Sequence, residues 1–286
     1  MSMILEILKS IVFGVVQGIT EWLPISSTGH LNFVNLFMPL NLYETAAMNA
    51  EYWNMYKVVI QFGSILAVLV LYWNKLNPFI PSKTANEKRK TYRLWLMAVI
   101  ATIPTGIIGL LLEDIVDEKL SGPMVFGIML IVYGVLFIVL EKFQKKPVIR
   151  STGMITVPKA FGVGLFQSLA LIPGTSRSGA TILGSTLLGF NRPTAVEFSF
   201  YLAIPTMLGA SLLKLLKMKM AMGAAGIIVL LVGMITAFAA SMICIQSLMK
   251  YVRTHGFKVF GIYRIVFGIL ILILLALGKL PTGFGA

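Results

Sequence analysis

Six long apolar runs constrain this chain more strongly than any other feature of its sequence. They occupy residues 56–73, 94–112, 123–140, 195–213, 224–245 and 260–278. Each is long enough for an α-helix to cross a hydrocarbon core about 30 Å thick. The runs are apolar on all sides, whereas the helices of a soluble bundle would carry a polar face. The sequence therefore predicts an all-α polytopic integral membrane protein with six transmembrane helices.

The composition supports this class and argues against binding of nucleic acid. Of the 286 residues, 57% are hydrophobic and only 12% are charged. The net charge of +13 could suit a nucleic-acid partner, but the Lys and Arg residues gather in short connectors between the runs. The positive-inside rule accounts for that distribution. The single cysteine, Cys244, lies within an apolar run and excludes an internal disulfide.

Two basic connectors orient the predicted spans. They carry Lys75, Lys83, Lys88, Arg89, Lys90 and Arg93 in the first, and Lys142, Lys145, Lys146 and Arg150 in the second. Both should be cytoplasmic, and the acidic "EDIVDEK" between them should lie outside. The segment before residue 54 must then start and end outside, and segment 159–190 must start and end inside. The scheme places three lysines outside, contrary to the positive-inside rule: Lys214, Lys217 and Lys219.

The two predicted hairpins resemble each other at an offset of 150 positions. Gly14, Gln17, Ser26 and Gly29 correspond to Gly164, Gln167, Ser176 and Gly179. We therefore predict two inverted repeats within a single membrane domain, residues 1–150 and 151–286. Each repeat consists of one re-entrant helical hairpin followed by three spans. This arrangement places a site near the midplane, where broken helices meet.

The first hairpin contains the polar motif "QGITEWLPISSTGH". Gln17 and Glu21 are four residues apart and share one helix face. Pro24 breaks that helix, and the following "SST" can cap a new one. His30 lies one turn beyond Ser26 and Ser27.

The second hairpin contains "PGTSRSGAT". Pro173 and Gly174 break the chain, either Thr175 or Ser176 caps the next helix, and Arg177 projects from its first turn. Two helix N-termini that face each other offer free N–H groups to an anion. Arg177 adds a bidentate donor for phosphate oxygens.

Each of these residues also has a purely structural interpretation. Hydroxyl residues after proline are common helix caps, Glu21 could serve only as the ion-pair partner of Arg177, and His30 could be a packing residue. An ionisable group inside a membrane is nevertheless costly and indicates a functional site. Three of them at broken helices favour the functional interpretation. His255, in the basic connector, reads as a solvated loop residue.

The two motifs together resemble those of the bacterial undecaprenyl-diphosphate phosphatases of the bacitracin-resistance type. "QGITEWLPISSTGH" is similar to the (E/Q)xxxE and PxSSxxH pattern of that family, and "PGTSRSGAT" to its PGxSRSxxT pattern. Length, span number and motif order agree over the whole chain. The resemblance implies a multi-pass protein of the bacterial plasma membrane that hydrolyses undecaprenyl diphosphate, recycles the lipid carrier for peptidoglycan synthesis and confers bacitracin resistance.

The resemblance also implies a divalent cation, Mg²⁺ or Ca²⁺. The acidic pair of the family corresponds to Gln17 and Glu21, which leaves Glu21 as the principal metal ligand or base. Ser27 or His30 would attack phosphorus, or water would attack it directly, and we favour Ser27 because His30 then stays free for acid–base work. The expected phosphate-binding residues are Arg177 together with Ser26, Thr28, Gly174, Thr175, Ser176, Ser178 and Thr181. The expected partners are the lipid substrate and the surrounding membrane lipids, and a homodimer is left open.

Two other functions fit parts of the sequence. A lipid phosphatase of the PAP2 type needs a second histidine with a nearby aspartate, and no aspartate follows His255. A transporter or flippase for the lipid carrier would also use an inverted repeat with opposed hairpins. Release of phosphate by purified protein in detergent separates hydrolysis from transport.

Overall fold

A computed structural model describes residues 2–120, 122–143, 146–217, 222–281 and 284. These residues form helices joined by loops, apart from one isolated parallel β-bridge between Ile149 and Phe190. The α-helices are α1 (Met3–Thr20), α2 (Ser27–Asn35), α3 (Ala46–Val59), α4 (Gln61–Leu71), α5 (Trp73–Leu76), α6 (Ala85–Lys119), α7 (Pro123–Lys142), α8 (Val157–Ser168), α9 (Arg177–Leu187), α10 (Arg192–Lys217), α11 (Ala224–Thr254) and α12 (Lys258–Ala276).

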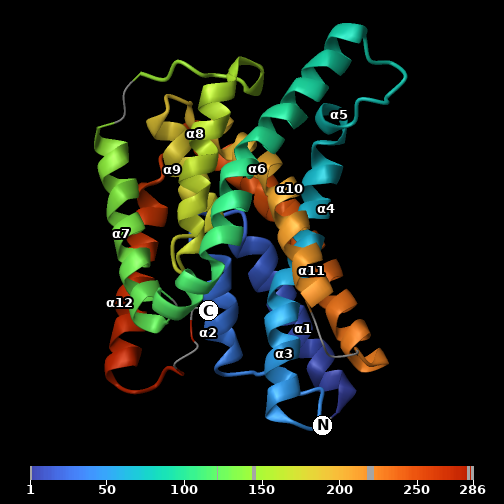
Figure 1. Ribbon diagram of the computed structural model, residues 1–286, viewed down its shortest axis with the longest axis vertical. Helices are drawn as coiled ribbons and strands as arrows, with labels where there is room; N and C mark the ends of the chain where they lie inside the picture. Colours follow the sequence, from blue (N-terminus) through green and yellow to red (C-terminus); the bar gives the residue numbers. More distant parts are fainter. Residues whose placement is uncertain (1, 121, 144–145, 218–221, 282–283, 285–286) are drawn as a thin grey trace.

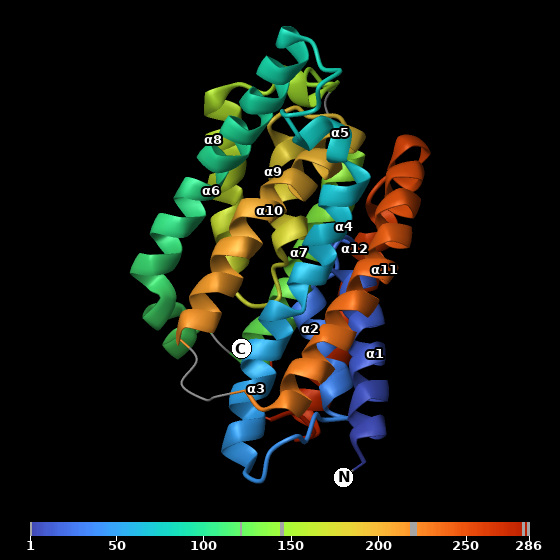
Figure 2. The same ribbon diagram turned by 90° about the vertical axis from the view of Figure 1, so that its right-hand side faces the viewer.

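Two helical hairpins enter the bundle from opposite ends. In Figure 1, α1 rises from the N-terminus at the lower end and α2 returns toward that end, whereas α8 and α9 lie at the upper end. Figure 2 shows the same relation after a 90° turn. Neither hairpin crosses the whole bundle, so both bring their tips to its middle. The opposed entry predicted from the charge distribution is therefore present.

The two halves of the chain pack into each other. Helix α1 packs along α11, and α8 packs along α6. A Cβ at Gly14 would stand 2.6 Å from the carbonyl oxygen of Gly233, and one at Gly164 would collide with the carbonyl oxygen of Ala101. Both glycines are needed for close approach, and they are one of the pairs matched at the 150-residue offset. Helices α7 and α12, one from each half of the chain, also pack together.

Seven segments of the described chain are long and apolar enough to cross a membrane. Six of them overlap most or all of one predicted apolar run each, with α3 and α4 forming one span over Ala46–Leu71. The seventh is α1, which the sequence assigned to the first hairpin. Helix α1 meets the same criteria of length and apolar composition as the other six segments. These two criteria therefore include it although it forms one arm of a hairpin. The prediction of an all-α polytopic membrane protein is confirmed.

The two basic connectors, between α4 and α6 and between α7 and α8, lie at the upper end in Figure 1. Arg93 donates to the carbonyl oxygens of Gly153 and Ile155, which joins the first basic connector to the segment before α8. Arg192, at the start of α10, pairs with Glu141 at the end of α7. The positive-inside rule predicts that this end faces the cytoplasm. Lys214 is near the opposite end of α10 and does not follow this distribution, and neither do Lys9 in α1, Lys119 at the end of α6 and Lys279 after α12. The described part does not include Lys145, Lys219 or the side chains of Glu113, Asp114, Asp117 and Lys217.

Candidate active site

The tips of the two hairpins are joined by hydrogen bonds. Ser178 Oγ, in the first turn of α9, donates to the carbonyl oxygen of Leu23 at 3.1 Å. Arg264, from α12, is fully buried and donates to the carbonyl oxygens of Pro24 at 3.0 Å and of Gly174 at 2.6 Å. One buried guanidinium therefore satisfies backbone acceptors on both tips, which would otherwise be costly at this depth.

Both tips contain a serine in the left-handed backbone region. Ser26 has φ 75° and Ser176 has φ 71°, and within the described chain these are the residues other than glycine with positive φ. Each precedes the first residue of a half-helix, Ser27 in α2 and Arg177 in α9. Such conformations cost about 1–3 kcal/mol and concentrate at functional sites. Ser176 rather than Thr175 caps α9, because its Oγ accepts from Gly179 N at 3.2 Å.

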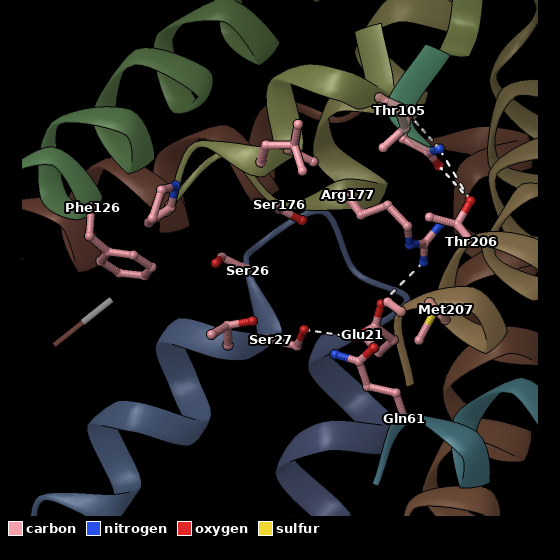
Figure 3. A pocket seen from close by; sticks show the side chains of 17 residues that line it. Glu21, Ser26, Ser27, Gln61, Thr105, Phe126, Ser176, Arg177, Thr206 and Met207 are labelled. Carbon is pink, nitrogen blue, oxygen red and sulfur yellow. Dashed lines mark hydrogen bonds and ion pairs between the residues drawn. The ribbon is translucent and has the colours of Figure 1, made fainter. Parts of the chain in front are cut away.

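A cavity of about 340 Å³ lies where the two half-helices begin. Figure 3 shows Arg177 pointing from one hairpin toward Glu21 and Ser27 on the other. The predicted residues that line the cavity are Glu21, Ser26, Ser27, Thr28, Gly174, Ser176 and Arg177. The N-termini of α2 and α9 thus border one space, as an anion site requires.

Glu21 connects the two hairpins. Its Oε2 accepts from Ser27 Oγ at 2.7 Å and from Gln17 Nε2 at 3.0 Å, and its Oε1 accepts from Arg177 Nη2 at 3.2 Å. The carboxylate is therefore positioned to take a proton from Ser27. The expected ion pair with Arg177 is also present, so the structural and the functional interpretation of Glu21 coexist.

Arg177 is held in place by hydrogen bonds, but one of its N–H donors has no partner. Its Nη1 donates to the carbonyl oxygen of Ser199 at 2.9 Å, and its Nε is buried without a partner. The guanidinium therefore has donor capacity that its contacts in this structure leave unused. Trp22 is fully buried beside the guanidinium, with 5.9 Å between its ring centroid and Cζ.

His30 is outside the group that lines the cavity. Its Nδ1 lies 2.7 Å from the carbonyl oxygen of Ser26, and its Nε2 lies 2.6 Å from the hydroxyl of Tyr263. The ring also stacks on Phe267, with centroids 4.4 Å apart. Both ring nitrogens are occupied, so His30 orients the backbone of Ser26 in this arrangement and has no free nitrogen for attack.

Four other predicted residues lie behind the cavity wall. Thr181 Oγ1 is hydrogen-bonded to Ser199 Oγ at 2.7 Å, and thereby supports the segment that anchors Arg177. Ser178 joins the tips, and Thr175 is fully buried with an unpaired hydroxyl. Gln17 is also fully buried, and it turns its amide nitrogen toward Glu21 while its Oε1 has no partner. Gln17 therefore supports the carboxylate here and does not present oxygen beside it.

Several residues at the site were not identified from the sequence. Arg264 is a cation within an apolar run, which by itself signals an unusual site, and Gln61 is a polar residue within another. Nothing in the sequence indicated that Ser199 belongs to the site. A polar wall of the cavity comes from Gln167, whose Nε2 donates to Thr105 Oγ1 at 3.0 Å and to Thr206 Oγ1 at 3.2 Å.

The described side chains that line the cavity supply too few ligands to hold a metal ion alone, so a bound cation would need further ligands. In the described part of the chain, no three His, Cys, Asp or Glu side chains cluster closely enough to hold a metal ion. Glu21 supplies the one carboxylate among the cavity-lining residues. Mg²⁺ is commonly held by one or two carboxylates together with substrate phosphates and water. The residues present therefore fit a divalent cation that is bound jointly with a diphosphate.

Comparison with known proteins identifies the family to which this chain belongs. The family described as bacitracin resistance protein BacA matches residues 10–270. The chain is 52% identical to Undecaprenyl-diphosphatase 1 of Clostridioides difficile, over 94% of this chain and 96% of that protein. It is 49% identical to the undecaprenyl-diphosphatase of Enterococcus faecalis, over 96% and 98% of the two chains. This protein belongs to the bacitracin resistance protein BacA family.

Proposed function

We propose that this protein is an undecaprenyl-diphosphate phosphatase. It hydrolyses undecaprenyl diphosphate to undecaprenyl phosphate and inorganic phosphate, which recycles the lipid carrier for peptidoglycan synthesis and confers resistance to bacitracin. Near full-length similarity to the undecaprenyl-diphosphatases supports this activity. The contact of Ser27, Glu21 and Arg177 between the two hairpin tips is the structural observation that carries it.

The headgroup would be bound by the elements that border the cavity. Arg177 and the N–H groups at the starts of α2 and α9 would hold the terminal phosphate, because helix N-termini and a planar guanidinium both favour phosphate oxygens. The hydroxyls of Ser26, Thr28 and Ser176 line the same cavity. Arg264 would fix the positions of the two half-helices relative to each other, because it donates hydrogen bonds to the backbone of both tips.

Ser27 is the proposed nucleophile. Its Oγ attacks the terminal phosphorus while its proton passes to Glu21, 2.7 Å away. The bond from that phosphorus to the bridging oxygen breaks, and undecaprenyl phosphate leaves with this oxygen and the proton from Glu21. Water then attacks the phosphoserine, Glu21 accepts a proton from the water and returns it to Ser27 Oγ, and inorganic phosphate leaves.

Glu21, with the diphosphate oxygens, is also the group that would hold Mg²⁺ or Ca²⁺. The ion would supply neutralisation of charge on the diphosphate. Gln17 would keep its supporting contact to Glu21. Chelation should then abolish phosphate release, and addition of the divalent ion should restore it.

Phosphate release by purified protein in detergent tests the proposed activity. Hydrolysis needs no two-sided membrane, so wild-type protein with a divalent cation should release phosphate from undecaprenyl diphosphate. A pure transporter would release none, and that result would replace the phosphatase by the flippase alternative.

The bacterial plasma membrane is the proposed location. Seven apolar helices make a multi-pass membrane protein, and the similar proteins named above are bacterial. Dimerisation stays a prediction that light scattering on the detergent-solubilised protein would check.

A further inference from the structure

An apolar groove adjoins the headgroup cavity. It lies between α6 and α10, has a volume of about 540 Å³ and shares Thr105, Leu171, Thr206 and Ala210 with the cavity. The cavity and the groove are therefore neighbours that share part of their lining. The groove continues along the second half of each helix, toward the end of the bundle opposite the basic connectors.

Two glycines leave the groove open where larger residues would fill it. Apart from the chain neighbours and backbone of its own helix, no atom lies within 4 Å of the place where a Cβ would stand at Gly106 on α6 or at Gly209 on α10. Leu110 and Leu213 flank these positions, and 72% and 39% of their surfaces are exposed. The groove is therefore open along its side, where lipid chains would surround the protein.

The groove offers almost no free hydrogen-bonding groups. Thr102 Oγ1 donates to the carbonyl oxygen of Ala98 at 2.9 Å, and Thr206 Oγ1 donates to that of Leu202 at 2.9 Å. Thr105 Oγ1 donates to the carbonyl oxygen of Gly164 at 3.2 Å. With these hydroxyls engaged, the groove presents an apolar surface, which suits a hydrocarbon ligand and disfavours a polar one.

We propose that this groove holds the first part of the polyprenyl chain of the substrate. This inference rests on the proposed function, because the occupant is the lipid tail of the diphosphate in the adjoining cavity. The tail is joined covalently to the headgroup, so it must leave the cavity through an apolar opening to the bilayer. The groove provides that opening beside Arg177 and Glu21, and burial of the tail there contributes binding energy that a tail-free diphosphate lacks.

Leucine substitutions within the groove test the proposal. Gly106→Leu and Gly209→Leu each add a side chain to open space in the middle of a helix, where leucine is also a better helix former than glycine. Gly223→Leu is the matched control, since Gly223 is exposed before α11 and also has no atom near its Cβ position. Hydrolysis of undecaprenyl diphosphate is compared with that of dimethylallyl diphosphate, which has a very short tail.

Both groove variants should raise KM for undecaprenyl diphosphate by about tenfold or more, because they remove space for the tail. Kinetics with dimethylallyl diphosphate should stay within about twofold of wild type, and the control should match wild type with both substrates. Equal losses with both substrates would mean that the site is distorted, and an unchanged KM for the long substrate would mean that the tail lies elsewhere. Either result overturns the proposal.

The same assay distinguishes this inference from the function on which it rests. Absence of phosphate release by wild type from both substrates would reject the phosphatase. An active wild type with insensitive groove variants would reject only the groove. As a direct measurement, undecaprenyl diphosphate with a photoreactive group near its headgroup should crosslink to peptides of α6 and α10. Crosslinks confined to the outer surface of α1 and α11 would contradict the proposal.

Discussion

Arg264 Nη1 donates a hydrogen bond to the carbonyl oxygen of Pro24 at 3.0 Å, across 240 residues of sequence. Its Nη2 donates to the carbonyl oxygens of Gly174 and Thr175 at 2.6 and 2.9 Å. One side chain therefore fixes the tip of the first hairpin relative to the tip of the second. Since Glu21 is on one hairpin and Arg177 on the other, the geometry of the site depends on this contact.

Arg264→Lys should destabilise the protein and lower turnover together. A lysine has one nitrogen and cannot reach the acceptors on both tips, and each lost charge-assisted bond costs about 1.5–3 kcal/mol. The unfolding temperature in detergent and phosphate release measure the two effects. Arg93→Lys is the control, because Arg93 also donates to two carbonyl oxygens but at the basic end. Equal, small effects of the two substitutions would contradict a special role for Arg264.

Ser27→Ala should abolish turnover and remove a phosphorylated intermediate. Substrate labelled in its terminal phosphate, followed by a rapid quench, should leave acid-stable phosphoserine on wild-type protein and none on the variant. An acid-labile, base-stable adduct that disappears in His30→Ala would show attack by His30 instead. Absence of both adducts would indicate direct attack by water.

Glu21→Gln should lower turnover by roughly 10²–10⁴-fold, the range for loss of a general base. The amide keeps the size of the side chain but accepts no proton and binds a hard cation poorly. Excess Mg²⁺ or Ca²⁺ should not restore full activity. Glu197→Gln is the control, because Glu197 pairs with Lys75 at 2.5 Å away from the cavity. An impaired Glu21→Gln protein with an unaltered metal titration would assign Glu21 to acid–base work alone.

Arg177→Lys should lower turnover by about a hundredfold, or roughly 3 kcal/mol of transition-state stabilisation. Lysine keeps the charge, but it loses the planar donor that contacts Ser199 and Glu21 together. Arg192→Lys, which alters the pair with Glu141, should retain near-normal turnover. If Arg177→Lys is as active as Arg192→Lys, the role of Arg177 is structural.

Cysteine labelling tests the orientation in the membrane. Single cysteines at Glu44 and at Arg89, in a Cys244→Ala background, are placed near opposite ends of the bundle. A membrane-impermeant thiol reagent added outside intact cells should label position 44 and not position 89. The reverse pattern would invert the orientation without altering the site.

The sequence determined the class of protein and the places where its helices break. Apolar runs long enough to cross a bilayer leave few alternatives to membrane helices, because unsatisfied backbone groups are too costly in lipid. Pro24 and Pro173 interrupt two further helices for a local steric reason, and the serines beside them begin the half-helices at Ser27 and Arg177. Such features depend on neighbouring residues, so they can be predicted from sequence.

Side-chain direction at the site could not be predicted in the same way. Helical periodicity places His30 one turn after Ser26, but only packing against α12 reveals that its ring lies on Phe267 and against the Tyr263 hydroxyl. Gln17 and Glu21 share a helix face as predicted, yet only the structure shows that the amide donates to the carboxylate.

The tertiary structure alone decided which distant groups meet. Arg264 is visible in the sequence as a cation in an apolar run, but the three carbonyl oxygens that its Nη atoms contact lie on two loops far away in the chain. Gly106 and Gly209 form an open groove only because α6 and α10 lie side by side. The physical reason is that apolar runs determine that helices enter the membrane, whereas close packing between helices determines which faces touch and which polar groups are left to bind a ligand.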